Sequence, residues 1–420
     1  MFTITAYNNQ YMYIDQNSMQ VILSVGVDES VSVAPAPLTL ALALDRSGSM
    51  EGERIHAARD GAIKVIQSLD ETIEFLVVTF NENAQLLFGP AMGTRENKQR
   101  AITILQTVRS NGRTRMSTAL DAIVKHLGND QTRAARILFL TDGKNEGETR
   151  SALTQSIQRC TSANISIDAW GVGTDWDAAE LRSMADKTHG TADIIPTPKQ
   201  VASAFAASFS AMRKTALTNV HLQLWSPAGV TLKSVQQVYP SLVPLSFQSD
   251  PTNPRQVSVS LGSFAVGEQH EYLCNLETPI YPPGQQFLLL RPSMQYVEAH
   301  MGIQEEKSGR SGWAFAQWTE DVALAAQTEQ HVAHYTHQEE LSQRLKDGQA
   351  ALAAGDTTRA TSLLGEALEI SERINNERIT RLLNTIVLRD AKGTIRLNQQ
   401  ADAVAKKTLA ITTGRTSKLK

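Results

Sequence analysis

The sequence predicts an α/β fold: a doubly wound, mostly parallel, Rossmann-like sheet that is inserted in or flanked by a β-sandwich and followed by a helical region. Three patterns support this prediction. Short apolar runs alternate with helical periodicity over residues 36–214, apolar and polar residues alternate at period two over residues 215–326, and residues 327–420 are charged and helical. The first pattern is typical of a parallel sheet, and the second of a sandwich.

The N-terminal segment, residues 1–35, is polar and strand-like. It ends near Pro35 and Pro37, which mark a boundary. A segment of this length is too short to form a stable sheet alone. We therefore expect it to join the sandwich, which makes the α/β domain an insertion within the sandwich.

The α/β domain, residues 36–214, opens with the nearly all-apolar run LTLALAL at residues 38–44, as expected for a strand covered on both faces. Residues 54–69 follow with apolar side chains at helical spacing. Further strands are expected at residues 73–80, 84–88, 137–140, 165–170 and 191–195, and further helices at 95–109, 117–127, 149–161, 177–187 and 198–213. Sheets of this kind bind ligands at the carboxyl ends of their strands.

The C-terminal region, residues 327–420, contains a stretch at residues 341–374 that resembles one tetratricopeptide-type hairpin with its turn at Gly355 and Asp356. Solenoids need about three repeats for stability, so a hairpin packed on its neighbours is favoured over a peptide-binding groove. The basic tail, defined as Arg415–Lys420, is expected to be frayed and solvated.

Three histidines, His331, His334 and His337, recur at spacings of three in this region. On a helix this spacing keeps them on one face, which leaves a zinc site open as one reading. Since no cysteine lies nearby, a packed or solvated histidine face is favoured.

Composition limits the function further. The 420 residues carry a formal net charge of -3, so no broad basic field favours nucleic acid or an anionic membrane. Only two cysteines occur, which fits a reducing compartment. The N-terminus lacks a basic start before an apolar run, and the longest apolar stretch is too short to span a bilayer. A cytoplasmic protein is therefore expected.

Polar side chains follow three strand-like or loop segments of the α/β domain. Asp45, Ser47 and Ser49 form a D-x-S-x-S pattern directly after the first strand, Thr114 stands in a G-x-T pattern before a helix, and Asp142 follows the strand at residues 137–140. In a doubly wound sheet such loops converge on one edge. A lone D-x-S-x-S is explained equally well by a turn and a helix cap, but its occurrence with the other two patterns predicts a metal site.

Two aspartates and three hydroxyls would supply oxygen ligands of modest total charge. This set suits Mg2+, which prefers octahedral oxygen ligation with one or two carboxylates and several waters. Mn2+ accepts the same ligands, and Ca2+ is a further alternative. An ion with few protein charges stays electrophilic, so its open position would favour an external Asp or Glu oxygen.

These motifs resemble those of the von Willebrand factor A domain. The resemblance extends from residue 38 to about residue 214 and rests on the motifs LALALDRSGSM, GRTRMSTAL, ILFLTDG and IDAWGVGTDWDAAELRSMA. It implies a metal-ion-dependent adhesion site, with the first ligand loop at Asp45, Ser47 and Ser49, the second at Thr114 and the third at Asp142. The whole chain is also similar to bacterial cytoplasmic proteins linked to Ser/Thr kinases, phosphatases or AAA+ ATPases.

The favoured function is a non-enzymatic interaction or scaffold module that binds a partner's carboxylate through the metal. Loops around Arg46, Met50, Glu51, Arg113 and Arg115 would set specificity, and self-association through the site is left open. One alternative is a metal-dependent phosphohydrolase with Asp45 as nucleophile, but Ser47 stands where a second acid would be needed. Another is an accessory subunit of an AAA+ ATPase or chelatase-type complex. The chain has no Walker motif, so any ATPase would be a separate protein.

Overall fold

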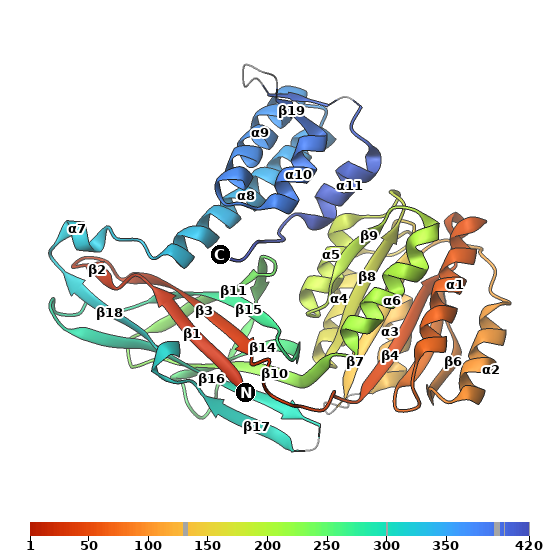
Figure 1. Ribbon diagram of the computed structural model, residues 1–420, viewed down its shortest axis with the longest axis horizontal. Helices are drawn as coiled ribbons and strands as arrows, with labels where there is room; N and C mark the ends of the chain where they lie inside the picture. Colours follow the sequence, from red (N-terminus) through yellow and green to blue (C-terminus); the bar gives the residue numbers. More distant parts are fainter. Residues whose placement is uncertain (129–132, 300, 390–394, 399, 420) are drawn as a thin grey trace.

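The computed structural model describes residues 1–128, 133–299, 301–389, 395–398 and 400–419. Figure 1 shows an α/β domain beside a β-sandwich, with a helical region next to both. The predicted fold class is confirmed: an α/β unit with a largely parallel sheet is combined with further sheets and a C-terminal helical region. No helix in the described ranges is long and apolar enough to cross a membrane.

The sheet of the α/β domain has six strands in the order β6-β5-β4-β7-β8-β9. All neighbours are parallel except β6, which is antiparallel to β5. The strands are β4 (Leu38–Asp45), β5 (Glu74–Phe80), β6 (Ala84–Met92), β7 (Ala134–Thr141), β8 (Ile165–Val172) and β9 (Ala192–Ile195). Every residue of β4 is buried, as its nearly all-apolar sequence predicts for a central strand covered on both faces.

Helices cover both faces of this sheet. They are α1 (Glu53–Ser68), α2 (Arg95–Leu105), α3 (Met116–Leu127), α4 (Arg150–Ser162), α5 (Ala178–Lys187) and α6 (Val201–Met212). Apolar side chains of α1, α2 and α6 share one core with the sheet, and those of α3, α4 and α5 share the other. The helix expected at residues 95–109 ends earlier, at Leu105.

The sandwich is built from two sheets, with strand orders β1-β3-β15-β11-β12 and β13-β14-β10-β16-β18-β2, and β17 pairs with β16. Its strands are β1 (Phe2–Asn8), β2 (Tyr11–Tyr13), β3 (Ser18–Val27), β10 (Thr215–Trp225), β11 (Thr231–Tyr239), β12 (Val243–Leu245), β13 (Phe247–Ser249), β14 (Gln256–Ala265), β15 (Gln269–Glu277), β16 (Gln286–Glu298), β17 (Gly302–Lys307) and β18 (Ala314–Thr319). The N-terminal segment contributes to both sheets: β3 lies between β1 and β15, and β2 pairs in parallel with β18.

The two connections between sandwich and α/β domain run side by side. The Ala36 N–H donates a hydrogen bond of 2.9 Å to the Thr215 carbonyl oxygen. Both connections meet the α/β sheet at the end where β4 begins. The carboxyl ends of β4 and β7, where the predicted metal loops start, therefore lie at the opposite end of the domain.

The helical region contains α7 (Val322–Ala325), α8 (Gln330–Ala353), α9 (Thr357–Arg373), α10 (Glu377–Ile386), the strands β19 (Val387–Arg389) and β20 (Ile395–Leu397), and α11 (Ala403–Thr412). The hairpin predicted around Gly355 and Asp356 is present as α8 and α9. Gly355 has a φ of 77°, and the Asp356 side chain caps α9 by accepting from the Arg359 N–H. Helices α8 to α11 share an apolar core.

The three histidines of α8 face its surroundings rather than a common metal. The His331 ring stacks on Tyr7 with centroids 3.6 Å apart, and His334 Nε2 donates to the Ser417 carbonyl oxygen at 2.8 Å. His337 lies 3.6 Å from Glu340 on its own helix. Among the described residues, no group of three or more His, Cys, Asp or Glu side chains gathers as a metal site. His331 and His334 are thus packed against other parts of the chain, whereas the His337 side chain is partly exposed.

The expectation of a frayed basic tail is wrong for its described part, which excludes Lys420. Arg415 pairs with Asp193 of β9 at 3.1 Å, and the Thr416 N–H donates to the Pro240 carbonyl oxygen at 2.9 Å. Because Ser417 also bonds to α8, this short segment touches the α/β domain, the sandwich and the helical region. Its backbone hydrogen bonds, which composition does not reveal, hold it in place.

A histidine cluster lies where the α/β domain meets the sandwich. His189 follows α5 with a φ of 55° and packs against Gly262 of β14, where an added Cβ would lie 2.7 Å from the histidine Cβ. Burial, and then the nearby His270 and His221, lower the pKa of His189 to about 4. The junction therefore favours an uncharged imidazole.

Acidification should weaken the protein between pH 6.5 and pH 4. In that window the unfolded chain binds a proton at His189 that the folded chain excludes. The contribution of His189 to the free energy of unfolding is therefore full above pH 6.5 and is lost as the pH falls toward 4. The loss is at most about 3 kcal/mol, at about 1.4 kcal/mol per pKa unit. Urea unfolding across this range should give a flatter pH dependence for His189→Asn, since asparagine tolerates positive φ. An identical dependence for both proteins would contradict this assignment.

Candidate metal centre

The first loop starts from Asp45, the last residue of β4, whose side chain is fully buried. Its Oδ1 accepts a hydrogen bond from the Ser47 N–H at 2.8 Å, and its Oδ2 accepts one from the Thr141 hydroxyl at 2.6 Å. The Ser47 and Ser49 hydroxyl oxygens lie 3.1 Å apart. The three residues of the D-x-S-x-S pattern thus turn their oxygens toward one another.

Burial and the neighbouring Asp142 disfavour the charged form of Asp45. Burial raises the pKa of its carboxyl to about 6, although the hydrogen bonds from Thr141 and Ser47 act in the opposite direction. The negative charge of Asp142 adds to the increase. A cation between these two carboxylates would favour their charged forms.

The third loop brings Asp142 to the same place, directly after β7. Its side chain is also fully buried. Its Oδ1 accepts a hydrogen bond of 2.6 Å from the Ser49 hydroxyl, and its Oδ2 lies 2.5 Å from Arg54 NH1. The first and third loops are therefore in direct contact.

Thr114, in the second loop, completes the group. The position of the Thr114 side chain follows from its distance to Gly143. A Cβ added to Gly143 would lie 3.1 Å from the Ser49 hydroxyl oxygen and 3.3 Å from the Thr114 hydroxyl oxygen. Both hydroxyls therefore lie close to Gly143, where a larger residue would crowd them. All five predicted ligand residues, Asp45, Ser47, Ser49, Thr114 and Asp142, are gathered at one end of the sheet.

The loop after Asp142 also holds the start of α3. The Glu146 N–H donates to the Thr114 carbonyl oxygen at 2.7 Å, and Asn145 Oδ1 accepts from the Met116 N–H at 3.1 Å. Glu148 accepts from both the N–H and the hydroxyl of Ser117. Because Arg115 provides no side-chain cap, these contacts satisfy N–H groups at the start of α3. The sequence analysis missed them, and only their place in the loop after T-D-G hinted at a role.

The predicted rim of the site needs one correction. Met50 is fully buried and belongs to the core beneath α1, so it cannot contact a partner. Glu51 and Arg113 are exposed, and Arg46 hydrogen-bonds to Asn111 at the surface. The sequence places Met50 in the ligand loop, but a short 3-10 turn at Gly48–Met50 directs it inward.

The donor set fits a hard divalent cation. Two carboxylates and three hydroxyls, all oxygen donors, lie together at this end of the sheet, and two of the hydroxyls adjoin Gly143. Oxygen ligands with one or two carboxylates suit Mg2+, whereas zinc sites are usually built from Cys and His. When bound, the ion would supply an electrophilic position for an external oxygen.

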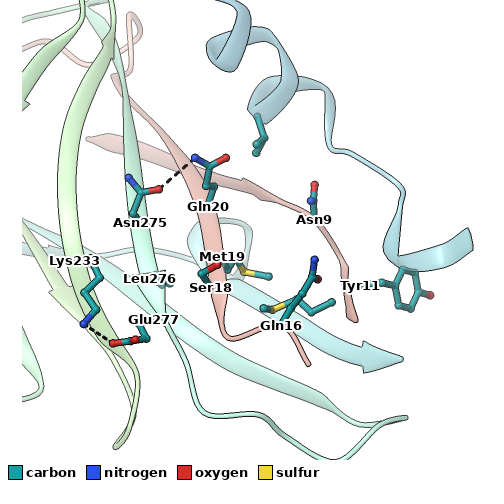
Figure 2. Close-up of a pocket in the computed structure, with 12 residues that line it drawn as sticks. Asn9, Tyr11, Gln16, Ser18, Met19, Gln20, Lys233, Asn275, Leu276 and Glu277 are labelled. Carbon is teal, nitrogen blue, oxygen red and sulfur yellow. Dashed lines mark hydrogen bonds and ion pairs between the residues drawn. The ribbon is translucent and has the colours of Figure 1, made fainter. Parts of the chain in front are cut away.

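A separate groove lies on the sandwich, outside the α/β domain. It has a volume of about 430 Å³ and is lined largely by amide and other uncharged side chains from β2, β3 and β15, with Val332 of α8 above them. Figure 2 shows that its charged residues, Lys233 and Glu277, pair with each other and that Gln20 pairs with Asn275. With its charges neutralised internally, the groove offers no comparable cation site.

A family model and solved structures match the fold of this chain. The family model for the von Willebrand factor type A domain matches residues 39–207. The solved structure of a von Willebrand factor type A protein from Catenulispora acidiphila superposes with a TM-score of 0.91 at 26% identity, and covers 100% of this chain and 97% of its own. The ArnB paralog VWA2 from Sulfolobus acidocaldarius shares the fold, with a TM-score of 0.65 at 15% identity over 99% of this chain and 98% of that one.

Sequence relatives match smaller parts of the chain. An uncharacterized protein of Synechocystis is 26% identical over 251 residues, which are 58% of this chain and 57% of the relative. Inter alpha-trypsin inhibitor heavy chain 4 of Mus musculus is 27% identical over 161 residues, or 36% of this chain and 17% of the relative. The matches thus span just over half of one relative and under a fifth of the other. From the motifs, the sheet order and these matches, we conclude that the chain contains a von Willebrand factor type A domain at residues 39–207, and that its relatives include bacterial proteins.

Proposed function

We propose that the chain is a non-enzymatic interaction module that binds a carboxylate of a partner protein through Mg2+. The ligands would be Asp45, Ser47, Ser49, Thr114 and Asp142. The observation that carries this proposal is the direct contact between loops far apart in sequence, in which the Ser49 hydroxyl bonds to both the first loop and Asp142. The domain itself belongs to a family of protein-interaction and adhesion modules.

Two features favour an acidic partner. The donor set has only two negative charges, which balance the charge of a divalent ion without exceeding it, so the ion stays electrophilic toward its open side. Arg46, Arg113 and Arg115 stand on the neighbouring loops and add positive charge to the rim. A partner segment with an Asp or Glu for the metal would meet these arginines through charge complementarity.

The phosphohydrolase alternative fits the site less well. Both oxygens of the Asp45 carboxylate accept hydrogen bonds, and the side chain is fully buried, so it is poorly placed to attack a substrate. Ser47, where that mechanism needs an acid, instead lies against the Ser49 hydroxyl. We therefore propose binding without turnover.

The setting of this module is part of the proposal. We expect a cytoplasmic protein whose partner is a Ser/Thr kinase, a phosphatase or an AAA+ ATPase, and whose sandwich and helical region position the metal end. Accessory function in a chelatase-type complex would use the same metal contact. Occupation of the site by an acidic residue of a second copy is the self-associating form of the same chemistry.

The test is affinity capture from the native lysate in three arms: wild type with Mg2+, wild type with EDTA, and Asp45→Ala with Mg2+. We expect a partner to be retained only by wild type with Mg2+. Substitution of the partner's own Asp and Glu residues should then identify the carboxylate that is bound. Sedimentation of the purified chain in Mg2+ and in EDTA identifies a second copy as the partner. Equal retention in all three arms would refute a metal-bridged function.

A further inference from the structure

Arg54 brings a positive charge to one of the proposed metal ligands. It lies in the first turn of α1, and its NH1 is 2.5 Å from Asp142 Oδ2. The two partners differ in environment, since the side chain of Asp142 is fully buried whereas that of Arg54 is 32% exposed. The guanidinium therefore neutralises a carboxylate that is otherwise shielded from water.

The same guanidinium has a second carboxylate within reach. Its NH2 lies 3.5 Å from Oδ2 of Asp175, which belongs to the loop between β8 and α5 and is 69% exposed. Arg54 thus bridges a buried carboxylate inside the site and an exposed one at its edge. A long, part-exposed side chain can leave the first partner and keep the second with little loss.

We propose that Arg54 is a displaceable counter-ion, which pairs with Asp142 when the metal is absent and moves toward Asp175 when a divalent cation binds. This inference rests on the proposed metal site. The positive charges of a guanidinium and a divalent cation held by one buried carboxylate repel each other. Arg54 therefore weakens metal binding, and it also spares the metal-free protein an unpaired buried charge.

This arrangement assigns opposite effects to the two partners of Arg54. Loss of Arg54 removes the competitor for Asp142, so metal binding should become tighter. Loss of the Asp175 charge removes the second ion-pair partner of Arg54. Arg54 should then leave Asp142 less easily, so metal binding should become weaker. An arginine whose charge does not act on the metal site would not produce this pair of opposite changes.

The experiment is calorimetric titration of the full chain with Mg2+, and with Mn2+ as a second probe. We expect Arg54→Gln to bind the metal about tenfold more tightly, the scale of one charge-assisted hydrogen bond that the ion no longer has to displace. Asp175→Asn should bind a few-fold more weakly. In EDTA, Arg54→Gln should melt at a lower temperature than wild type, because Asp142 is then buried without its partner.

The matched control is Arg59→Gln, which makes the same change on the same helix. Arg59 donates to the carbonyl oxygens of Gln106 and Val108 rather than to a carboxylate, so metal affinity should be unchanged. Arg54→Lys keeps the positive charge but lacks the planar guanidinium. Its metal affinity should therefore lie between those of wild type and Arg54→Gln. It serves as the test variant if Arg54→Gln does not fold.

Equal or weaker binding by Arg54→Gln would overturn the proposed role of Arg54, while binding by wild type would leave the metal site intact. If neither wild type nor any Arg54 variant binds the metal, the proposed metal site is refuted, and so is the role of Arg54 that rests on it. The two failures are therefore distinguishable in one set of titrations.

Discussion

Asp45→Asn should abolish Mg2+ binding, with a loss of more than about 100-fold in affinity, and should leave the metal-free fold intact. The charge that attracts the ion is lost, yet the shape is kept: Asn Oδ1 can still accept from the Ser47 N–H, and Asn Nδ2 can donate to the Thr141 hydroxyl oxygen. Wild type at a metal concentration of 100 Kd should gain about 2.7 kcal/mol, or roughly 5–10 °C in melting temperature of the α/β domain. Asp45→Asn should show no metal-dependent stabilisation. Calorimetry measures the metal affinity, and thermal melting measures the stabilisation.

The control for this substitution is Asp121→Asn. Asp121 lies on α3 and pairs with Arg159 on the surface, with both side chains about half exposed. Its removal should therefore leave the metal-dependent stabilisation unchanged. Metal stabilisation of Asp45→Asn equal to that of wild type would mean that the ion binds elsewhere.

Leu23→Ala should destabilise the sandwich by about 2–5 kcal/mol, and removal of residues 1–30 should prevent it from folding. Leu23 is completely buried in the core between the two sheets, and β3 is flanked by β1 and β15. The truncation removes two of five strands from one sheet, a loss that exceeds the usual stability of about 5–15 kcal/mol. Urea unfolding followed by far-ultraviolet circular dichroism measures both effects.

Gln20→Ala is the matched control on the same strand. Gln20 is exposed on the outer face of β3 and bonds only loosely, at 3.3 Å, to Asn275. Its loss should cost no more than about 0.5 kcal/mol. An unchanged melting curve after removal of residues 1–30 would show that the N-terminal strands are dispensable.

The parts that the sequence predicted well have local signatures. The all-apolar run at residues 38–44 becomes the central strand β4, because only a strand covered on both faces can bury every side chain. The ligand residues follow strand ends or precede a helix, and the parallel topology brings such positions together whatever their separation in the chain. The turn at Gly355 and Asp356 could also be predicted, because the positive φ and the helix cap that it requires depend only on neighbouring residues.

The parts that could not be predicted depend on contacts between distant segments. Arg54 looks like an ordinary polar residue in the first turn of an amphipathic helix, and only the folded chain brings it to Asp142. The basic tail is held by side-chain and backbone contacts to three distant parts of the chain, for which composition carries no signal. Met50 was misassigned because a residue inside a ligand loop can still turn into the core.

The inserted position of the α/β domain has a mechanical consequence. One connection continues from β3, in one sheet of the sandwich, and the other leads into β10, in the other sheet. A tensile force applied at the metal end is divided between the two sheets. Both connecting strands pair with a neighbour on each side, so the force enters each sheet through a strand that is hydrogen-bonded along both edges. The sandwich thus anchors the α/β domain at two points.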